Sequence, residues 1–157
     1  TKYCQAVPAT NRVVGEQCTA SNQCAGGQCV PESNTGAACT PNCYFGGYCT
    51  QNCDAGSCPG GTTCSQYTFS GTSKWCADNC DWDGGQGDCR ENYVCDRGLV
   101  AGSTQATCFK KCFNNANCFA GTTCTNGFCC GAIGFRCCPG AAKCPTSGTC
   151  SALDYCQ

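Results

Sequence analysis

The chain has 157 residues, 25 of them cysteine, with no histidine and a formal net charge of −1. The lack of histidine removes the commonest general base, and the balanced charge without basic clusters argues against a nucleic-acid partner. We therefore expect neither an enzyme nor a nucleic-acid-binding protein.

Aliphatic residues are too scarce for an ordinary core, because the sequence contains only six valines, two leucines and one isoleucine. Disulfides must then supply the stability that apolar burial usually supplies. The predicted fold class is a set of small disulfide-rich modules made of short β-hairpins and loops, with little helix, no conventional hydrophobic core and an elongated tandem arrangement.

The cysteine content also predicts where the protein works. Disulfides persist in oxidising compartments, so we expect a secreted protein that is extracellular or at a cell surface. Thr1 is not followed by a charged and apolar leader, which favours a mature chain. No apolar run approaches the roughly 18 residues of a membrane-spanning helix, so we expect no membrane insertion.

The cysteines repeat in related spacings along the chain, which predicts tandem modules. The predicted order is an N-terminal cysteine-rich segment over residues 1–38, cysteine-rich repeats over 39–76 and 76–108, a short repeat over 108–129, and a tail over 124–157. Glycine and small polar residues fill the gaps and favour turns, with one helical turn near residues 90–94. The odd cysteine count leaves at least one thiol without a partner in the chain. Cys4 and Cys156 are the candidates for an intermolecular bond, because they flank the modules.

Three segments carry a family resemblance: Cys18-Thr-Ala-Ser-Asn-Gln-Cys24-Ala-Gly-Gly-Gln-Cys29, Cys58-Pro-Gly-Gly-Thr-Thr-Cys64 and Cys130-Gly-Ala-Ile-Gly-Phe-Arg-Cys137-Cys138. Their arrangement resembles the cysteine-rich repeats of secreted bacterial surface proteins. That resemblance implies a surface or matrix component and no particular activity.

Residues 58–76 are locally similar to a hevein-type chitin-binding module. The resemblance implies that a serine and three aromatic rings contact a sugar, and they would be Ser65, Tyr67, Phe69 and Trp75. Thr63 and Ser70 stand where that family has cysteines, so its disulfide pairing cannot be kept. The alternative is that the aromatic residues alternate because this segment is a hairpin with one packed face.

The acidic segment from Asp81 to Asp88 is a candidate calcium site. Asp81, Asp83 and Asp88 surround a glycine-rich turn, and hard cations bind several oxygens from such loops. The alternative is a solvated acidic turn. Thiolate metal sites are less favoured: Cys-x3-Cys steps fit zinc spacing, but the repeat shows no four-ligand set.

The tail has six cysteines from Cys124 to Cys150 with the adjacent pair Cys137 and Cys138 in the middle. This order resembles an inhibitor cystine knot and implies a secreted inhibitor or toxin-like protein, although the spacing leaves many pairings open.

The function we expect is structural: a disulfide-stabilised subunit of a surface layer, matrix or filament that self-associates. Fifteen aromatic side chains are too many for modules without cores, so some should form contact surfaces. Polysaccharide binding and inhibition are the alternatives, and calcium is the one cofactor considered.

Overall fold

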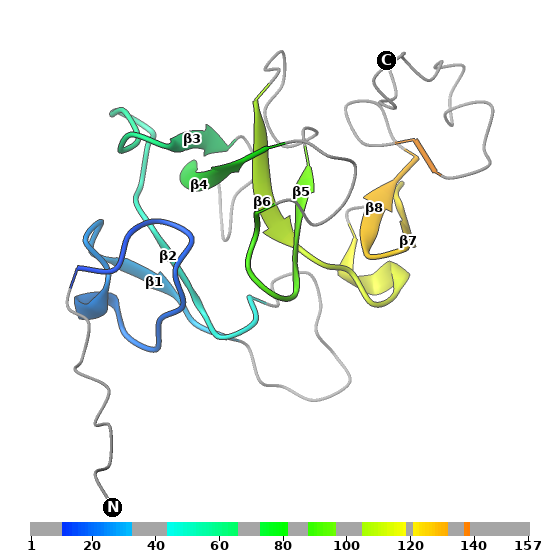
Figure 1. The fold of residues 1–157 in the computed structure, drawn as a ribbon, viewed down its shortest axis with the longest axis horizontal. Helices are drawn as coiled ribbons and strands as arrows, with labels where there is room; N and C mark the ends of the chain where they lie inside the picture. Colours follow the sequence, from blue (N-terminus) through cyan, green and yellow to red (C-terminus); the bar gives the residue numbers. More distant parts are fainter. Residues whose placement is uncertain are drawn as a thin grey trace, which may run out of the picture.

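The computed structural model describes residues 11–32, 44–65, 73–81, 88–96, 105–118, 121–131 and 137–138. Within them the regular structure consists of short antiparallel strands and two single-turn 3-10 helices, which confirms the predicted disulfide-rich β-hairpin fold (Figure 1). The elements are β1 (Gln28–Val30), β2 (Tyr48–Thr50), β3 (Thr62–Ser65), β4 (Trp75–Cys80), β5 (Tyr93–Asp96), β6 (Ala106–Lys110), β7 (Thr123–Thr125), β8 (Phe128–Cys130), η1 (Ser21–Gln23) and η2 (Asn115–Asn117).

Eight disulfides group sixteen of the described cysteines into four units with one pairing scheme. In each unit the first cysteine bonds to the third, and the second bonds to the last. The pairs are Cys18–Cys29 and Cys24–Cys49 in unit 1, Cys53–Cys64 and Cys58–Cys76 in unit 2, Cys80–Cys95 and Cys89–Cys108 in unit 3, and Cys112–Cys124 and Cys118–Cys129 in unit 4. The domain ranges given by the sequence stay predictions, because this grouping is by disulfide alone.

Every unit ends in a hairpin whose two cysteines face each other. The register partners are Cys29 and Cys49, Cys64 and Cys76, Cys95 and Cys108, and Cys124 and Cys129. Partners in an antiparallel register point their side chains to the same face of the sheet. Both strands are therefore crosslinked to the loop that precedes them, and this loop covers the hairpin in place of an apolar layer.

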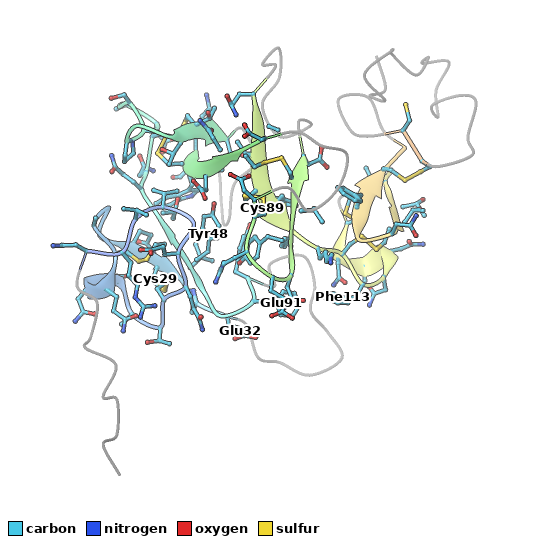
Figure 2. The ribbon with its side chains drawn as sticks, in the orientation of Figure 1. Cys29, Glu32, Tyr48, Cys89, Glu91 and Phe113 are labelled. Atoms are coloured by element: carbon cyan, nitrogen blue, oxygen red, sulfur yellow. A yellow bond between two sulfur atoms is a disulfide. The ribbon has the colours of Figure 1, made fainter. Side chains whose placement is uncertain are left out.

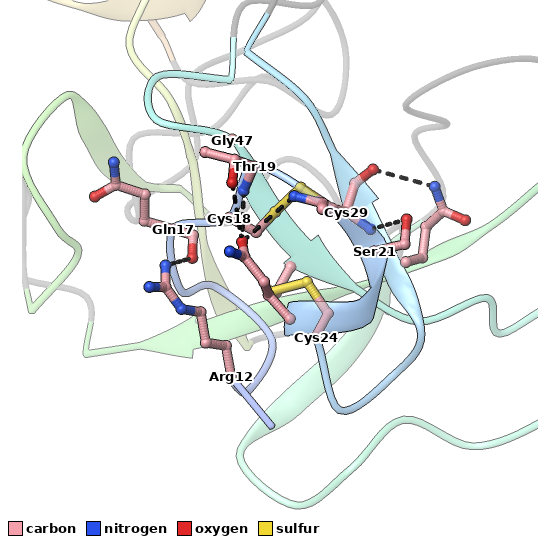
Figure 3. Close-up of a disulfide and its surroundings, with 12 residues drawn as sticks. Arg12, Gln17, Cys18, Thr19, Ser21, Cys24, Cys29 and Gly47 are labelled. Atoms are coloured by element: carbon pink, nitrogen blue, oxygen red, sulfur yellow. Dashed lines mark hydrogen bonds between the residues drawn. A yellow bond between two sulfur atoms is a disulfide. The ribbon is translucent and has the colours of Figure 1, made fainter. Parts of the chain in front are cut away.

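Units 1 and 4 open with the same short turn. The side-chain oxygen of Gln23 accepts hydrogen bonds from the N–H groups of Thr19 (2.8 Å) and Ala20 (3.3 Å), as Figure 3 shows for Thr19. Asn117 does the same for Phe113 (2.9 Å) and Asn114 (3.2 Å). An amide placed just before the second cysteine thus pairs backbone groups that a 3-10 turn leaves without partners.

Units 2 and 3 are joined by a strand that runs through their boundary. Three residues separate the last cysteine of each unit from the first of the next, and between units 2 and 3 these residues are strand, so both cysteines point to the same face. β4 carries Cys76 of unit 2 and Cys80 of unit 3, and the four-stranded sheet has the order β3-β4-β6-β5. Units 2 and 3 therefore share one sheet, and in Figure 1 unit 2 lies above unit 1, with β7 and β8 of unit 4 to the right of the central body.

The largest buried cluster is built from cysteines and tyrosines. Tyr44, Tyr48 and Tyr93 are at most 3% exposed, and they pack among cysteines of units 2 and 3 with Val14 and a single alanine. The rings of Tyr48 and Tyr93 stack with centroids 5.5 Å apart. This composition agrees with the prediction of no conventional hydrophobic core. We call units 1, 2 and 3 together the central body.

One local prediction is wrong. The helical turn expected near residues 90–94 is a tight turn followed by β5, in which Val94 pairs with Phe109 of β6. Asn92 has a φ of 67°, which closes the turn, and β5 must be extended because Cys95 faces Cys108. In the part of the chain that the structure describes, no helix is long and apolar enough to cross a membrane.

Candidate functional site

A cavity of about 210 Å³ with a polar lining opens in the central body. It lies where the segment before unit 1 meets the strands of the shared sheet. We call it the junction pocket. Its polar lining comes from Glu16, Tyr48, Asp78, Asp88, Arg90 and Tyr93.

A glycine lets the chain approach close enough to form this pocket. Gly15 has a φ of +94°, and its N–H donates to the carbonyl of Cys49 at 3.0 Å. A Cβ at this position would lie 2.8 Å from the Oδ2 of Asp78, which is too close. Only glycine accepts both the backbone conformation and the contact without strain. The residue beside it, Glu16, is thereby brought toward Asp78.

Tyr48 links unit 1 to the shared sheet. Its ring is 1% exposed, and its hydroxyl oxygen accepts a hydrogen bond of 2.9 Å from the backbone N–H of Asp78 (Figure 2). Burial raises the pKa of Tyr48, and it also raises the pKa of Tyr93. Both phenols therefore stay neutral at physiological pH.

Arg90 is the cation of the pocket. Its guanidinium donates to the carbonyl of Gly47 in unit 1 and, at 2.7 Å, to the hydroxyl of Tyr93 in unit 3. The same group lies 4.2 Å from the ring centroid of Tyr93 and 5.8 Å from that of Tyr48. Arg90 thus covers the tyrosine pair by cation–π contact and ties two units together.

Asp78 is the carboxylate most affected by its surroundings. Half-burial, and then the negative charges of Asp88 and Glu16, raise its pKa to about 6. The other two carboxylates have local donors. Glu16 accepts from the N–H of Val13 at 2.7 Å, and Asp88 accepts from the N–H of Asp81 at 3.2 Å. With its raised pKa, Asp78 gains a proton at mildly acidic pH.

The pocket is a contact between units that is lined by charged and phenolic side chains. Three carboxylates, one guanidinium and two phenols face it, and the contacts of Tyr48 and Arg90 join different units. The spacing of the sequence does not reveal this set, because Glu16, Asp78 and Arg90 lie in three separate segments with no shared motif. Only Asp88 was singled out from the sequence.

The predicted calcium residues are partly brought together. Asp81 and Asp88 are exposed and adjacent, since the Asp81 N–H donates to Asp88. Asp83 lies outside the described residues. The calcium site stays a prediction.

The predicted sugar-binding residues lie on the hairpin of unit 2. Ser65 and Trp75 are register partners, but Ser65 is 3% exposed and Trp75 is half-buried against the tyrosine-cysteine cluster. Packing of Trp75 is what the hairpin interpretation expects. Tyr67 and Phe69 lie outside the described residues, so sugar binding stays a prediction.

The cysteines of the tail pair in part with unit 4. Cys124 bonds to Cys112, and Cys130 bonds to Cys138. The prediction that Cys124 is the first cysteine of a knot over Cys124–Cys150 is therefore wrong, because Cys124 closes unit 4. The candidate intermolecular cysteines, Cys4 and Cys156, lie outside the described residues.

Exposed aromatic surface is scarce in the described part of the chain. The exposed large hydrophobic residues there are Val13 (61%) and Phe113 (60%). Phe113 makes an edge contact with Phe45 of unit 1 at 5.2 Å, so it joins unit 4 to the central body (Figure 2). The other described rings mostly pack inside or between units.

Comparisons with protein-family models, with curated proteins and with solved structures gave no match. The functional proposals therefore rest on the residues of this chain.

Proposed function

We propose that the protein is an extracellular structural or interaction protein, a disulfide-stabilised subunit of a surface layer, matrix or filament. The observation that supports this proposal best is the fourfold use of one crosslinked unit, with units 2 and 3 sharing one sheet. Such a chain is made rigid by crosslinks and by contacts between its units, without a conventional core. Rigid tandem units are typical building blocks for extended extracellular assemblies.

The contacts between units add to this rigidity. Arg90 of unit 3 binds the carbonyl of Gly47 in unit 1, and the hydroxyl of Tyr48 binds the backbone between units 2 and 3. Each disulfide also restricts the unfolded chain, and this typically stabilises the folded state by about 2–4 kcal/mol. A chain held at such short intervals resists proteases, because proteolysis requires local unfolding.

Self-association completes the proposal. The unpaired cysteine required by the odd count would link neighbouring chains covalently, with Cys4 and Cys156 as the candidates. Phe113, as an exposed ring on unit 4, is the described residue best placed to add an apolar contact.

The test is the intact mass of the unreduced protein after alkylation in denaturant. The expected result is a covalent multimer that collapses to the 16.2 kDa chain on reduction. One of the single variants Cys4→Ser and Cys156→Ser, each of which leaves an even number of cysteines, should remain monomeric, and Cys130→Ser/Cys138→Ser, which keeps the odd count, serves as the control. A monomer with one alkyl group, together with a sedimentation coefficient that does not change with concentration, would refute the proposal.

Polysaccharide binding is a second candidate, favoured by one observation. Ser65 and Trp75, two of the hevein-like contact residues, are direct neighbours across the hairpin of unit 2. Retention on chitin, lost in Trp75→Ala but kept in Phe113→Ala, would support it. Equal retention of both variants would reject it.

A further inference from the structure

We propose that each of the four units is also a four-thiolate metal site: when its two disulfides are reduced, its four cysteines bind one soft divalent ion such as Zn²⁺ or Cd²⁺. The unit would then be closed by either of two chemistries. Disulfides close it under oxidising conditions, and a metal ion closes it under reducing conditions.

The geometry behind this proposal is the contact between the two disulfides of a unit. In every unit three sulfur atoms, two from one disulfide and one from the other, lie within 4.8 Å of one another, and Figure 3 shows the two disulfides of unit 1. The fourth sulfur is covalently bonded to a member of the set. The sets are Cys18, Cys24 and Cys49; Cys53, Cys58 and Cys64; Cys80, Cys89 and Cys95; and Cys112, Cys118 and Cys129.

These sulfur positions suit tetrahedral coordination. A structural zinc ion binds thiolates at about 2.3 Å, which places its ligand sulfur atoms about 3.8 Å apart. Sulfur atoms already within 4.8 Å reach such positions through side-chain rotation, once the S–S bonds are cut. The hairpin contributes two of the four ligands from facing positions, and the preceding loop contributes the other two.

The ligand type selects the class of metal. Thiolates are soft ligands and favour Zn²⁺, Cd²⁺ and Cu⁺ over Ca²⁺ or Mg²⁺. All three sulfur-bearing residues of the sets in units 1 and 3 are buried, so bound metal would be shielded from water. The sequence contains no histidine, so the proposed ligands of each ion are cysteine sulfur atoms alone.

The sequence spacing points to a different grouping from the one that the structure shows. Cys-x3-Cys steps such as Cys76 to Cys80 match zinc spacing, but they connect neighbouring units and their cysteines belong to different disulfides. The four ligands of one site instead come from within one unit. This grouping makes the stoichiometry specific: one ion for each unit.

The conversion balances as two separate steps. A trialkylphosphine reduces each disulfide with two electrons, takes an oxygen atom from water to become the phosphine oxide, and leaves two thiols. One divalent ion then binds four thiols as thiolates and releases four protons. Metal binding should consequently weaken as the pH falls.

Cadmium titration of the full chain, reduced with a trialkylphosphine under argon, tests the proposal. Bound cadmium is followed by thiolate charge-transfer absorption, and near-ultraviolet circular dichroism reports whether Tyr48 and Tyr93 regain their packed environment. Alkylation followed by mass spectrometry then shows which cysteines the metal protects. We expect the four cysteines of each unit to be protected together, with the tyrosine signal restored.

Two double variants check the assignment of ligands. Cys112→Ser/Cys124→Ser should lower the cadmium content by one ion and expose Cys118 and Cys129, with unit 2 still protected. Cys89→Ser/Cys108→Ser should do the same for Cys80 and Cys95, which guards against a folding defect peculiar to unit 4. Protection spread over cysteines of different units, or cadmium bound without the tyrosine signal, would overturn the proposal, because an unfolded thiol-rich chain also binds cadmium.

Discussion

Unit 4 and the central body use the same disulfide pairing, but they differ in what surrounds it. The central body packs three tyrosines among its cysteines and shares a four-stranded sheet, whereas the buried cluster of unit 4 consists of cysteines alone. Within the described residues, unit 4 is attached through the strand after Cys108, the hydrogen bond from the Lys111 N–H to the carbonyl of Asn92, and the Phe45–Phe113 contact. The crosslinks thus shape each unit, and the aromatic residues determine which units merge.

The largest effect should come from the tyrosine pair. Tyr93→Ala removes a fully buried ring that stacks on Tyr48 and carries Arg90 above it, so we expect a loss of about 3–5 kcal/mol in stability of the central body. Phe113→Ala, at a ring 60% exposed, is the matched control and should cost about 0.5 kcal/mol or less. Chemical denaturation without reductant measures both. Similar losses for the two variants would contradict the distinction between the regions.

The second-largest effect should come from removing one disulfide in each region, which shows whether the two regions unfold independently. Cys89→Ala/Cys108→Ala opens a bond inside the tyrosine-cysteine cluster, and we expect a loss of about 2–5 kcal/mol that raises hydrogen exchange across β4, β5 and β6. Cys112→Ala/Cys124→Ala should raise exchange in β7 and β8 only. Exchange that spreads from unit 4 into β5 and β6 would show one cooperative body.

Lys110 lies where β6 leaves the central body toward unit 4. Lys110 is 4% exposed, and its ammonium lies 5.5 Å from the ring centroid of Tyr44. Burial lowers its pKa to about 8. Since the folded-state pKa is below the unfolded value of 10.5, stability should rise as the pH increases from about 8 toward 10.5. Lys110→Met keeps the packing of the stem and should raise stability at pH 7 by about 1 kcal/mol. Lys111→Met is the control.

The smallest effect should be the pH response of the junction pocket. The pKa of Asp78 is raised to about 6 in the folded state from 3.8, so stability should increase as the pH falls from above 6 toward 4. Asp78→Asn should be more stable than the parent at pH 7.5, by about 1 kcal/mol after allowance for solvent screening at this half-buried group, and should lose this pH response. Glu91→Gln, at an exposed position, is the control. If Asp78→Asn kept the pH dependence of stability, that dependence would belong to Glu16 or Asp88 and not to Asp78.

The sequence predicts the fold class well because cysteine content and the scarcity of aliphatic residues act everywhere in the chain. Spacing also indicates repeats, but it does not distinguish a Cys-x3-Cys step inside a module from one between units, as Cys76 and Cys80 show. The junction pocket could not be predicted, since Glu16, Tyr48 and Asp78 meet only after the units dock. Trp75 illustrates the same limit: its ring packs inward because its strand joins two units.

The most direct test of the fourfold unit is a disulfide map of the unreduced protein. Proteolysis at acidic pH, which suppresses exchange, followed by mass spectrometry with and without reduction gives the linked peptides. The expected result is Cys112 linked to Cys124 and Cys118 linked to Cys129, with the corresponding first-to-third and second-to-last pairs in units 1, 2 and 3. Bonds between facing hairpin cysteines, such as Cys124 to Cys129 or Cys95 to Cys108, would contradict the account.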